Sequence, residues 1–98
     1  MINTVTLFPR SISPEELDDL LTNVIHSFKD ADRLNSLKVS DGDIMSPGGP
    51  PSYSKVVEAS FDTLEDMMMW VQTPAAQTQK GVMIEKGVVM LYFEVKEL

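Results

Sequence analysis

The segment from residue 53 to residue 66 constrains the fold more than any other part of the chain. Its first part, Tyr53–Phe61, alternates between two sets of side chains, a pattern typical of a strand. Asp62 then stands as a helix N-cap with Glu65 three residues later, which predicts that a helix begins directly after the strand. A strand that leads straight into a helix indicates a domain that packs helices against a sheet.

The N-terminal part of the chain predicts another strand and another helix. Residues 2–8 alternate in the same way, and Pro9 ends this strand. Ser13, Pro14 and Glu16 supply an N-cap, a proline at the first helical position and a glutamate at the third, so a helix is expected to begin there. Apolar side chains then recur at the helical period and form one stripe: Leu17, Leu20, Leu21, Val24, Ile25 and Phe28.

Two further strands complete the order βαββαβ. The pattern between residues 34 and 45 is weaker, but Leu37 and Val39 alternate, and we expect a short strand there. Residues 46–52 are rich in glycine and proline and are expected to form a loop. A last strand is expected over residues 87–95.

The helix after Asp62 leaves two large apolar side chains uncovered. It is expected to end before Pro74, and its buried stripe consists of Leu64, Met67, Met68 and Val71. Turning about 100° per residue places Met69 nearly opposite this stripe and Trp70 on its flank. Both side chains therefore need cover from residues 75–80 or from another subunit.

The last strand is apolar on both faces, and this determines the expected architecture. One face carries Val88, Met90 and Tyr92, and the other carries Val89, Leu91, Phe93 and Val95. Two helices can cover only one face of a four-stranded antiparallel sheet, which would leave the face with Val88, Met90 and Tyr92 open. A second copy of the sheet is therefore expected to cover that face. Residues 1–98 are therefore expected to form a single α+β domain with the ferredoxin-like βαββαβ order, which pairs through its open sheet face into a homodimeric α+β barrel.

Composition excludes several classes of function. The chain has no cysteine, which excludes disulfides, a thiolate nucleophile and a cysteine-ligated zinc. Its net charge of -7 opposes binding to phosphate backbones, so nucleic acid is not expected as a partner. No apolar run approaches the roughly 20 residues of a membrane span, and the first residues lack the features of a signal peptide. We therefore expect a cytoplasmic protein that does not bind membranes.

Glu58 is the leading candidate for a catalytic group. The alternation places it on the face away from the helices, where desolvation inside a dimer barrel would suit a carboxylate to act as a general acid or base. Tyr92 is expected beside it as a hydrogen-bond donor to a substrate oxygen. Five more side chains are expected to line the same cavity and bind ligand: Thr4, Thr6, Val56, Ser60 and Met90. Two structural alternatives remain: Glu58 in a rim ion pair or a hydrogen bond to a neighbouring strand, and Tyr92 simply packed with its hydroxyl in water.

Other chemistry is not expected from this sequence. His26, the single histidine, is expected to face solvent, although a covering subunit would let it transfer protons. Asp41, Gly42 and Asp43 lack the remaining ligands of a calcium loop and are interpreted as a turn. No glycine pattern cradles phosphate and no serine lies in a nucleophile elbow. We therefore expect neither a metal nor a cofactor.

Several motifs together resemble those of the EthD-like family of small dimeric α+β barrel proteins. They are Ser13-Pro14-Glu15-Glu16, Gly48-Gly49-Pro50-Pro51, Tyr53, Val56-Val57-Glu58, Phe61-Asp62, Leu64-Glu65-Asp66 and Thr73-Pro74. The resemblance implies a dimeric barrel that acts on small organic compounds, since related barrels include muconolactone isomerases and cofactor-free monooxygenases. The histidine that family members commonly carry on the first helix corresponds here to Ile25, with His26 one position away.

Three hypotheses about function follow. The first is a cofactor-free isomerase, lyase or monooxygenase that transforms a small apolar or aromatic metabolite in a pocket bearing Glu58 and Tyr92. The second is a module that binds such a ligand in the same pocket without chemistry. The third is a structural homodimer whose barrel is filled by its own side chains, including Met90 and Tyr92.

Overall fold

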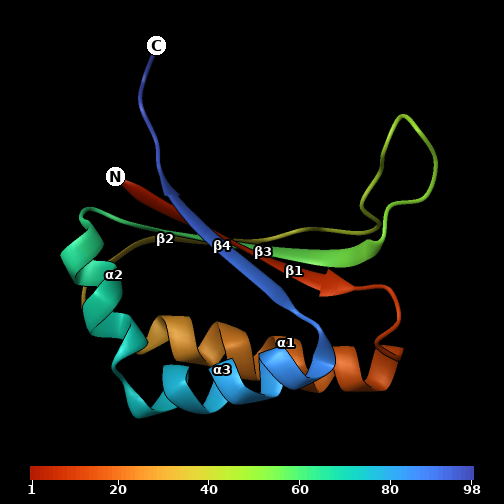
Figure 1. The fold of residues 1–98 in the computed structure, drawn as a ribbon, viewed down its shortest axis with the longest axis horizontal. Helices are drawn as coiled ribbons and strands as arrows, with labels where there is room; N and C mark the ends of the chain where they lie inside the picture. The colour runs from red at the N-terminus through yellow and green to blue at the C-terminus, as the bar shows by residue number, and fades with distance from the viewer.

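The computed structural model describes residues 1–98 as one sheet with helices on a single side. The elements are β1 (Ile2–Pro9), α1 (Pro14–Lys29), β2 (Leu34–Val39), β3 (Tyr53–Phe61), α2 (Leu64–Val71), α3 (Pro74–Lys86) and β4 (Val89–Glu94). The four strands are antiparallel in the order β2-β3-β1-β4. Helices α1 and α3 lie below the sheet in Figure 1, α2 lies at its left end, and no helix covers the opposite face. The expected α+β ferredoxin-like fold class is confirmed.

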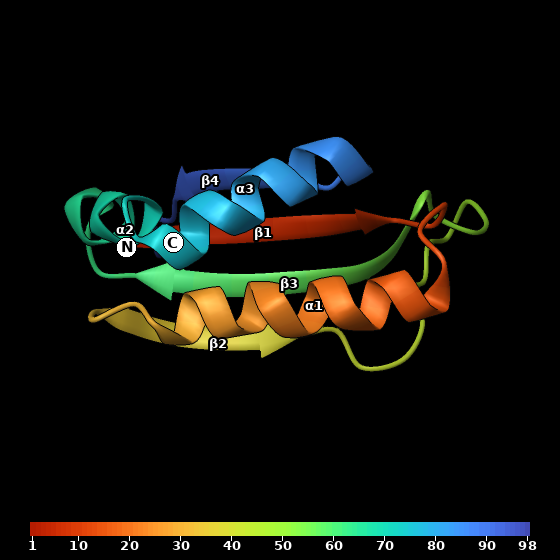
Figure 2. The same ribbon diagram turned by 90° about the horizontal axis from the view of Figure 1, so that it is seen from below.

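Helix α1 begins as its sequence predicts. The side chain of Ser13 accepts a hydrogen bond from the backbone N–H of Glu16 at 3.3 Å, and Pro14 occupies the first helical position. Its stripe buries Leu20, Val24 and Phe28 against the sheet. Figure 2 shows α1 along the β2 and β3 half of the sheet and α3 along the β1 and β4 half.

Helix α3 is an addition to the predicted order. Residues 75–80 were expected only to cover Met69 and Trp70, yet Pro74–Lys86 is helical over 13 residues. Thr73 caps this helix by accepting from the N–H of Ala76 at 3.2 Å, with Pro74 at the first position, as Ser13 and Pro14 do for α1. The helix ends at Gly87, whose φ of 78° lies in the left-handed region that glycine adopts readily.

The start and the buried side of α2 differ from the prediction. Thr63, not Asp62, is the N-cap, and its hydroxyl accepts from the N–H of Asp66 at 3.1 Å. Met67 and Trp70 are buried, whereas Leu64 and Met68 are exposed. The expected stripe is correct for Met67 and for Val71, which packs against the core, and wrong for Leu64 and Met68. The helix has only eight residues, and it is oriented so that Trp70 inserts between α1 and the sheet.

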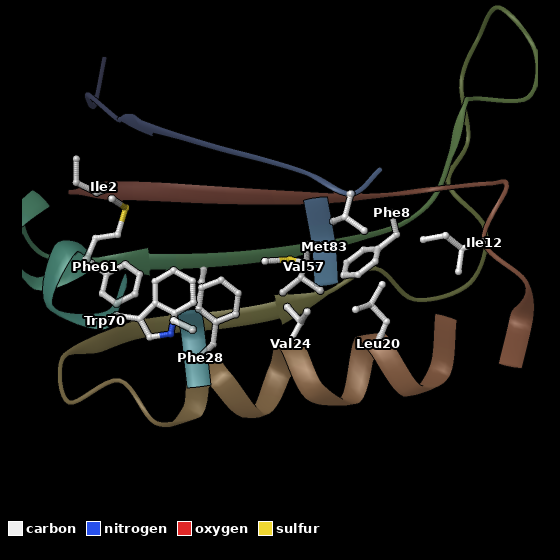
Figure 3. Packing of buried hydrophobic residues seen from close by; sticks show 14 residues of the cluster. Ile2, Phe8, Ile12, Leu20, Val24, Phe28, Val57, Phe61, Trp70 and Met83 are labelled. Carbon is white, nitrogen blue, oxygen red and sulfur yellow. The ribbon is translucent and has the colours of Figure 1, made fainter. Parts of the chain in front are cut away.

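An aromatic cluster forms one end of the core. The ring of Trp70 stacks on that of Phe28 of α1, with the two ring centroids 4.3 Å apart. The ring of Phe61 of β3 is tilted against it, with the centroids 6.0 Å apart (Figure 3). The indole N–H of Trp70 donates to the backbone carbonyl of Ser27 at 2.7 Å. Trp70 therefore joins α2, α1 and the sheet, and its one polar atom is satisfied.

An exposed ion pair joins the last turn of α3 to the first turn of α1. The ammonium of Lys86 donates to a carboxylate oxygen of Glu16 at 2.9 Å. This hydrogen bond, together with the negative charge of Glu16, raises the pKa of Lys86. Because both groups lie in water, the pair contributes little to stability.

None of the three helices combines the length and the apolar character that a membrane span requires.

Candidate functional site

The register of the sheet separates the predicted site residues into two groups. Thr6 of β1 lies opposite Val57 of β3 on one side and Met90 of β4 on the other. Residues that pair directly across a sheet share a face, and Val57 is completely buried beneath the helices. By the same pairing Thr4 and Tyr92 lie on the helix side. Four of the seven predicted residues therefore face the helices.

The other three predicted residues lie on the open face. Val56, Glu58 and Ser60 pair with Leu7, Val5 and Asn3, which alternate with the buried residues of β1. The prediction that all seven residues line one cavity is wrong. Its physical cause is β4, which is apolar on both faces, so alternation alone could not indicate which set faces the helices.

The helix side contains an apolar pocket between α2, α3 and β4. Its volume is about 360 Å³, within the range of small-molecule sites, and ten of its twelve lining residues are hydrophobic. The lining residues are Met67, Met68, Trp70, Val71, Ala76, Gln77, Lys80, Met83, Ile84, Val88, Met90 and Tyr92. Two predicted site residues, Met90 and Tyr92, thus contribute to this pocket from β4.

Few polar groups reach this pocket. Gln77 and Lys80 come from α3, and Tyr92 comes from β4. The amide nitrogen of Gln77 donates to the carbonyl of Val71 at 2.6 Å, which fixes this side chain between α2 and α3. The lining residues include no carboxylate and no imidazole. The pocket can therefore hold an apolar body and donate hydrogen bonds to it, and its only proton-transfer groups are Lys80 and Tyr92.

The α3 side of the pocket does not follow from the elements that the sequence predicts. Gln77, Lys80, Met83 and Ile84 were not proposed as lining residues, because no helix was expected over Pro74–Lys86. The signal was present in Thr73-Pro74, which repeats the start of α1 but was interpreted only as the end of α2. A helix placed there would have enclosed the space beneath β4.

Glu58 lies outside this pocket. It is exposed on the open face, with Val5 beside it on β1 and Lys38 opposite it on β2. Ser60, on the same face, shares a hydrogen bond with Ser36 of β2, so its hydroxyl has a structural partner. The catalytic role of Glu58 stays a prediction, and it would require a second site between subunits.

The single histidine does not contribute to the pocket. His26 is exposed on α1, as expected from its position off the apolar stripe. Asp41 and Asp43 are likewise exposed, near a bend at Gly42. No three histidine, aspartate or glutamate side chains are grouped so that they could hold a metal ion.

Two buried threonines of β1 provide a matched test of hydrogen bonding on the helix side. The hydroxyl of Thr4 donates to the carbonyl of Ala59 at 3.2 Å, whereas the hydroxyl of Thr6 has no partner. We expect Thr4→Val to lower the free energy of unfolding by about 1 kcal/mol, and Thr6→Val to leave it unchanged or to raise it. Urea denaturation of the two variants measures this difference. Equal losses would show that the Thr6 hydroxyl also stabilises the fold.

The fold matches solved structures at low sequence identity. No family model and no curated protein matches the sequence. An EthD family protein of Bacillus halodurans aligns with a TM-score of 0.78 at 18% identity, over 98% of this chain and 99% of that one. A hydroxynitrile lyase of Passiflora edulis aligns with a TM-score of 0.77 at 13% identity, over 99% and 94% of the two chains.

A third match is to a protein described as dimeric. A dimeric ferredoxin-like protein of unknown function from Thermobifida fusca aligns with a TM-score of 0.72 at 14% identity, over 96% of this chain and 90% of that one. The three matches show that the chain shares the ferredoxin-like fold of these proteins. The resemblance to EthD-like proteins is confirmed as a structural match over nearly the whole chain.

Proposed function

We propose that the protein binds a small, mainly apolar or aromatic organic molecule in the pocket between α2, α3 and β4. The observation that carries this proposal is a pocket of about 360 Å³ with ten hydrophobic lining residues. A cavity of this kind, with a few polar groups at its edge, is the usual form of a site for a small metabolite. The proposal retains the sequence-based hypothesis of a small-molecule protein and moves its site to the helix side of the sheet.

Chemistry without a cofactor is a finer form of the same proposal. The similar fold of a hydroxynitrile lyase supports lyase chemistry as one candidate. In this chain the groups available to move a proton at the pocket are the phenol of Tyr92 and the ammonium of Lys80. Binding without turnover is favoured by the lack of a carboxylate or imidazole among the lining residues.

We also propose that the protein is a homodimer paired through its open sheet face. That face carries six apolar side chains on its two central strands and its β4 edge: Val5, Leu7, Val56, Val89, Leu91 and Phe93. Leu91 and Phe93 are 52% and 45% exposed in the single chain, so water contacts much of their surface. The match to a dimeric ferredoxin-like protein supports pairing as the means of covering them.

Binding of 2-naphthol, followed by the fluorescence of Trp70, tests the proposed pocket. Trp70 is the only tryptophan and lines the pocket, so a bound aromatic molecule should change its emission. Adjacent methionines supply the variants, because Met68 lines the pocket and Met69 does not, while both are about half exposed. We expect Met68→Asp to weaken binding about tenfold, since it replaces apolar contact area with a charge.

The control is Met69→Asp, which adds the same charge one residue away on the same helix. It should bind 2-naphthol as the unaltered protein does. Saturable binding that Met68→Asp and Met69→Asp weaken equally would place the ligand elsewhere. Absence of any saturable change would overturn the proposed binding pocket.

A further inference from the structure

We propose that the pocket selects a small aromatic carboxylate, with the ring among the methionines and the carboxylate at Lys80. This inference rests on the proposed function, because it assigns a ligand class to the same pocket. The apolar lining explains why a ring would bind, but it does not distinguish a neutral ligand from an anionic one. The charge at the edge of the pocket makes that distinction.

The charge of the lining differs from the charge of the chain. The sequence has 15 acidic and 8 basic residues. The twelve lining residues include one cation, Lys80, and no carboxylate. A negative net charge of -7 repels anions from the protein as a whole, and Lys80 supplies a local exception at the pocket.

Lys80 is free to meet a ligand. The two ion pairs of the chain are Arg33 with Asp66 and Lys86 with Glu16, so Lys80 takes part in neither. Lys80 follows Gln77 by three residues, which places both on the same side of α3. One N–H of the Gln77 amide already donates to the carbonyl of Val71, whereas the ammonium of Lys80 has no ion-pair partner in the chain.

The other wall of the pocket edge carries a second donor. Tyr92 of β4 lines the same pocket, on the helix side of the sheet, and its phenol can donate a hydrogen bond. The buried end of the pocket is formed by Met67, Trp70 and Met83, which offer soft apolar contacts to a ring. A ligand with a flat apolar body and one anionic end fits both the buried end and the edge.

A matched pair of probes separates this inference from the proposed function. The probes are 2-naphthoate, which is an anion at pH 7, and 2-naphthol, which has the same ring system and is neutral. Calorimetric titration at low and high salt measures both with the unaltered protein, Lys80→Gln, Lys80→Arg and a control variant. The control is Lys29→Gln, which makes the same charge change at the end of α1, outside the pocket.

We expect 2-naphthoate to bind more tightly than 2-naphthol, and Lys80→Gln to weaken 2-naphthoate about fivefold without affecting 2-naphthol. Lys80→Arg and Lys29→Gln should bind 2-naphthoate nearly as the unaltered protein does. High salt should weaken binding of 2-naphthoate alone, because it screens an exposed ion pair. If Lys80→Gln fails to fold, this salt dependence in the unaltered protein decides the question.

Two other results would overturn different parts of the argument. Equal binding of both probes, unaffected by Lys80→Gln and by salt, would disprove the selection for an anion and leave the apolar pocket intact. Failure of both probes to bind would overturn the proposed function itself.

Discussion

The proposed homodimer is expected to dissociate into monomers when Leu91 is replaced by glutamate. Leu91 lies on the open face in the middle of β4. It pairs with Val5 of β1, and Val5 pairs on its other side with Glu58 of β3. A glutamate at this position would be buried without a partner when two sheets meet, and it would lie on the same face as the carboxylate of Glu58. In a symmetric dimer the change occurs twice, so we expect the dissociation constant to rise about 1000-fold.

Sedimentation velocity over a range of protein concentrations measures this change in assembly. The control is Ile84→Glu, because Ile84 is an apolar residue of α3 that is 68% exposed on the helix side. It should leave the dimer intact, and both variants should keep the circular dichroism of the unaltered protein. A dimer that survives Leu91→Glu but dissociates with Ile84→Glu would assign the interface to the helices and disprove pairing through the open face.

Trp70→Ala is expected to lower the free energy of unfolding by about 4 kcal/mol, the largest loss of stability that we predict for a single side chain. The substitution removes the ring that stacks on Phe28 and contacts Phe61, and it leaves a cavity where α2 meets α1. It also removes the donor to the carbonyl of Ser27. A loss of this size is a large part of the total stability of a small domain.

Urea denaturation followed by circular dichroism measures this loss without relying on tryptophan fluorescence. Trp70→Phe keeps an aromatic ring and removes the hydrogen bond, so it should cost clearly less than Trp70→Ala. Met69→Ala, at the exposed neighbouring position, should change stability by less than about 0.5 kcal/mol. Similar losses for Trp70→Ala and Met69→Ala would show that the aromatic cluster does not hold α2 in place.

The fold could be predicted from the sequence because its local signals agree with its tertiary structure. Ser13 and Pro14 begin α1 as expected, and Ile2–Pro9 and Tyr53–Phe61 form strands as their alternation predicts. Helix α3 was missed for a physical reason. Only Ala76 and Met83 of its 13 residues are buried, so the apolar stripe that marks most helices is nearly absent.

The site could be predicted only in part, because it depends on register. Met90 and Tyr92 were correctly expected on one face of β4, but their face was assigned to the side of Glu58. A strand with two largely apolar faces carries no information about which face lies against the helices. In the structure, the pairing of Tyr92 with Thr4 and of Met90 with Thr6 places their face on the helix side. Lys80 was missed with α3, since a single lysine in a polar segment has no pattern of its own.

The alternation of β4 has a consequence for how this protein could be altered. Even-numbered positions such as Met90 and Tyr92 line the pocket, while odd-numbered positions such as Leu91 and Phe93 lie on the face proposed to pair. The six residues of this edge strand thus contribute alternately to two different surfaces, the pocket and the open face. Substitutions at even positions could retune the choice of ligand while the quaternary structure persists, and substitutions at odd positions could release single subunits that each retain a whole pocket.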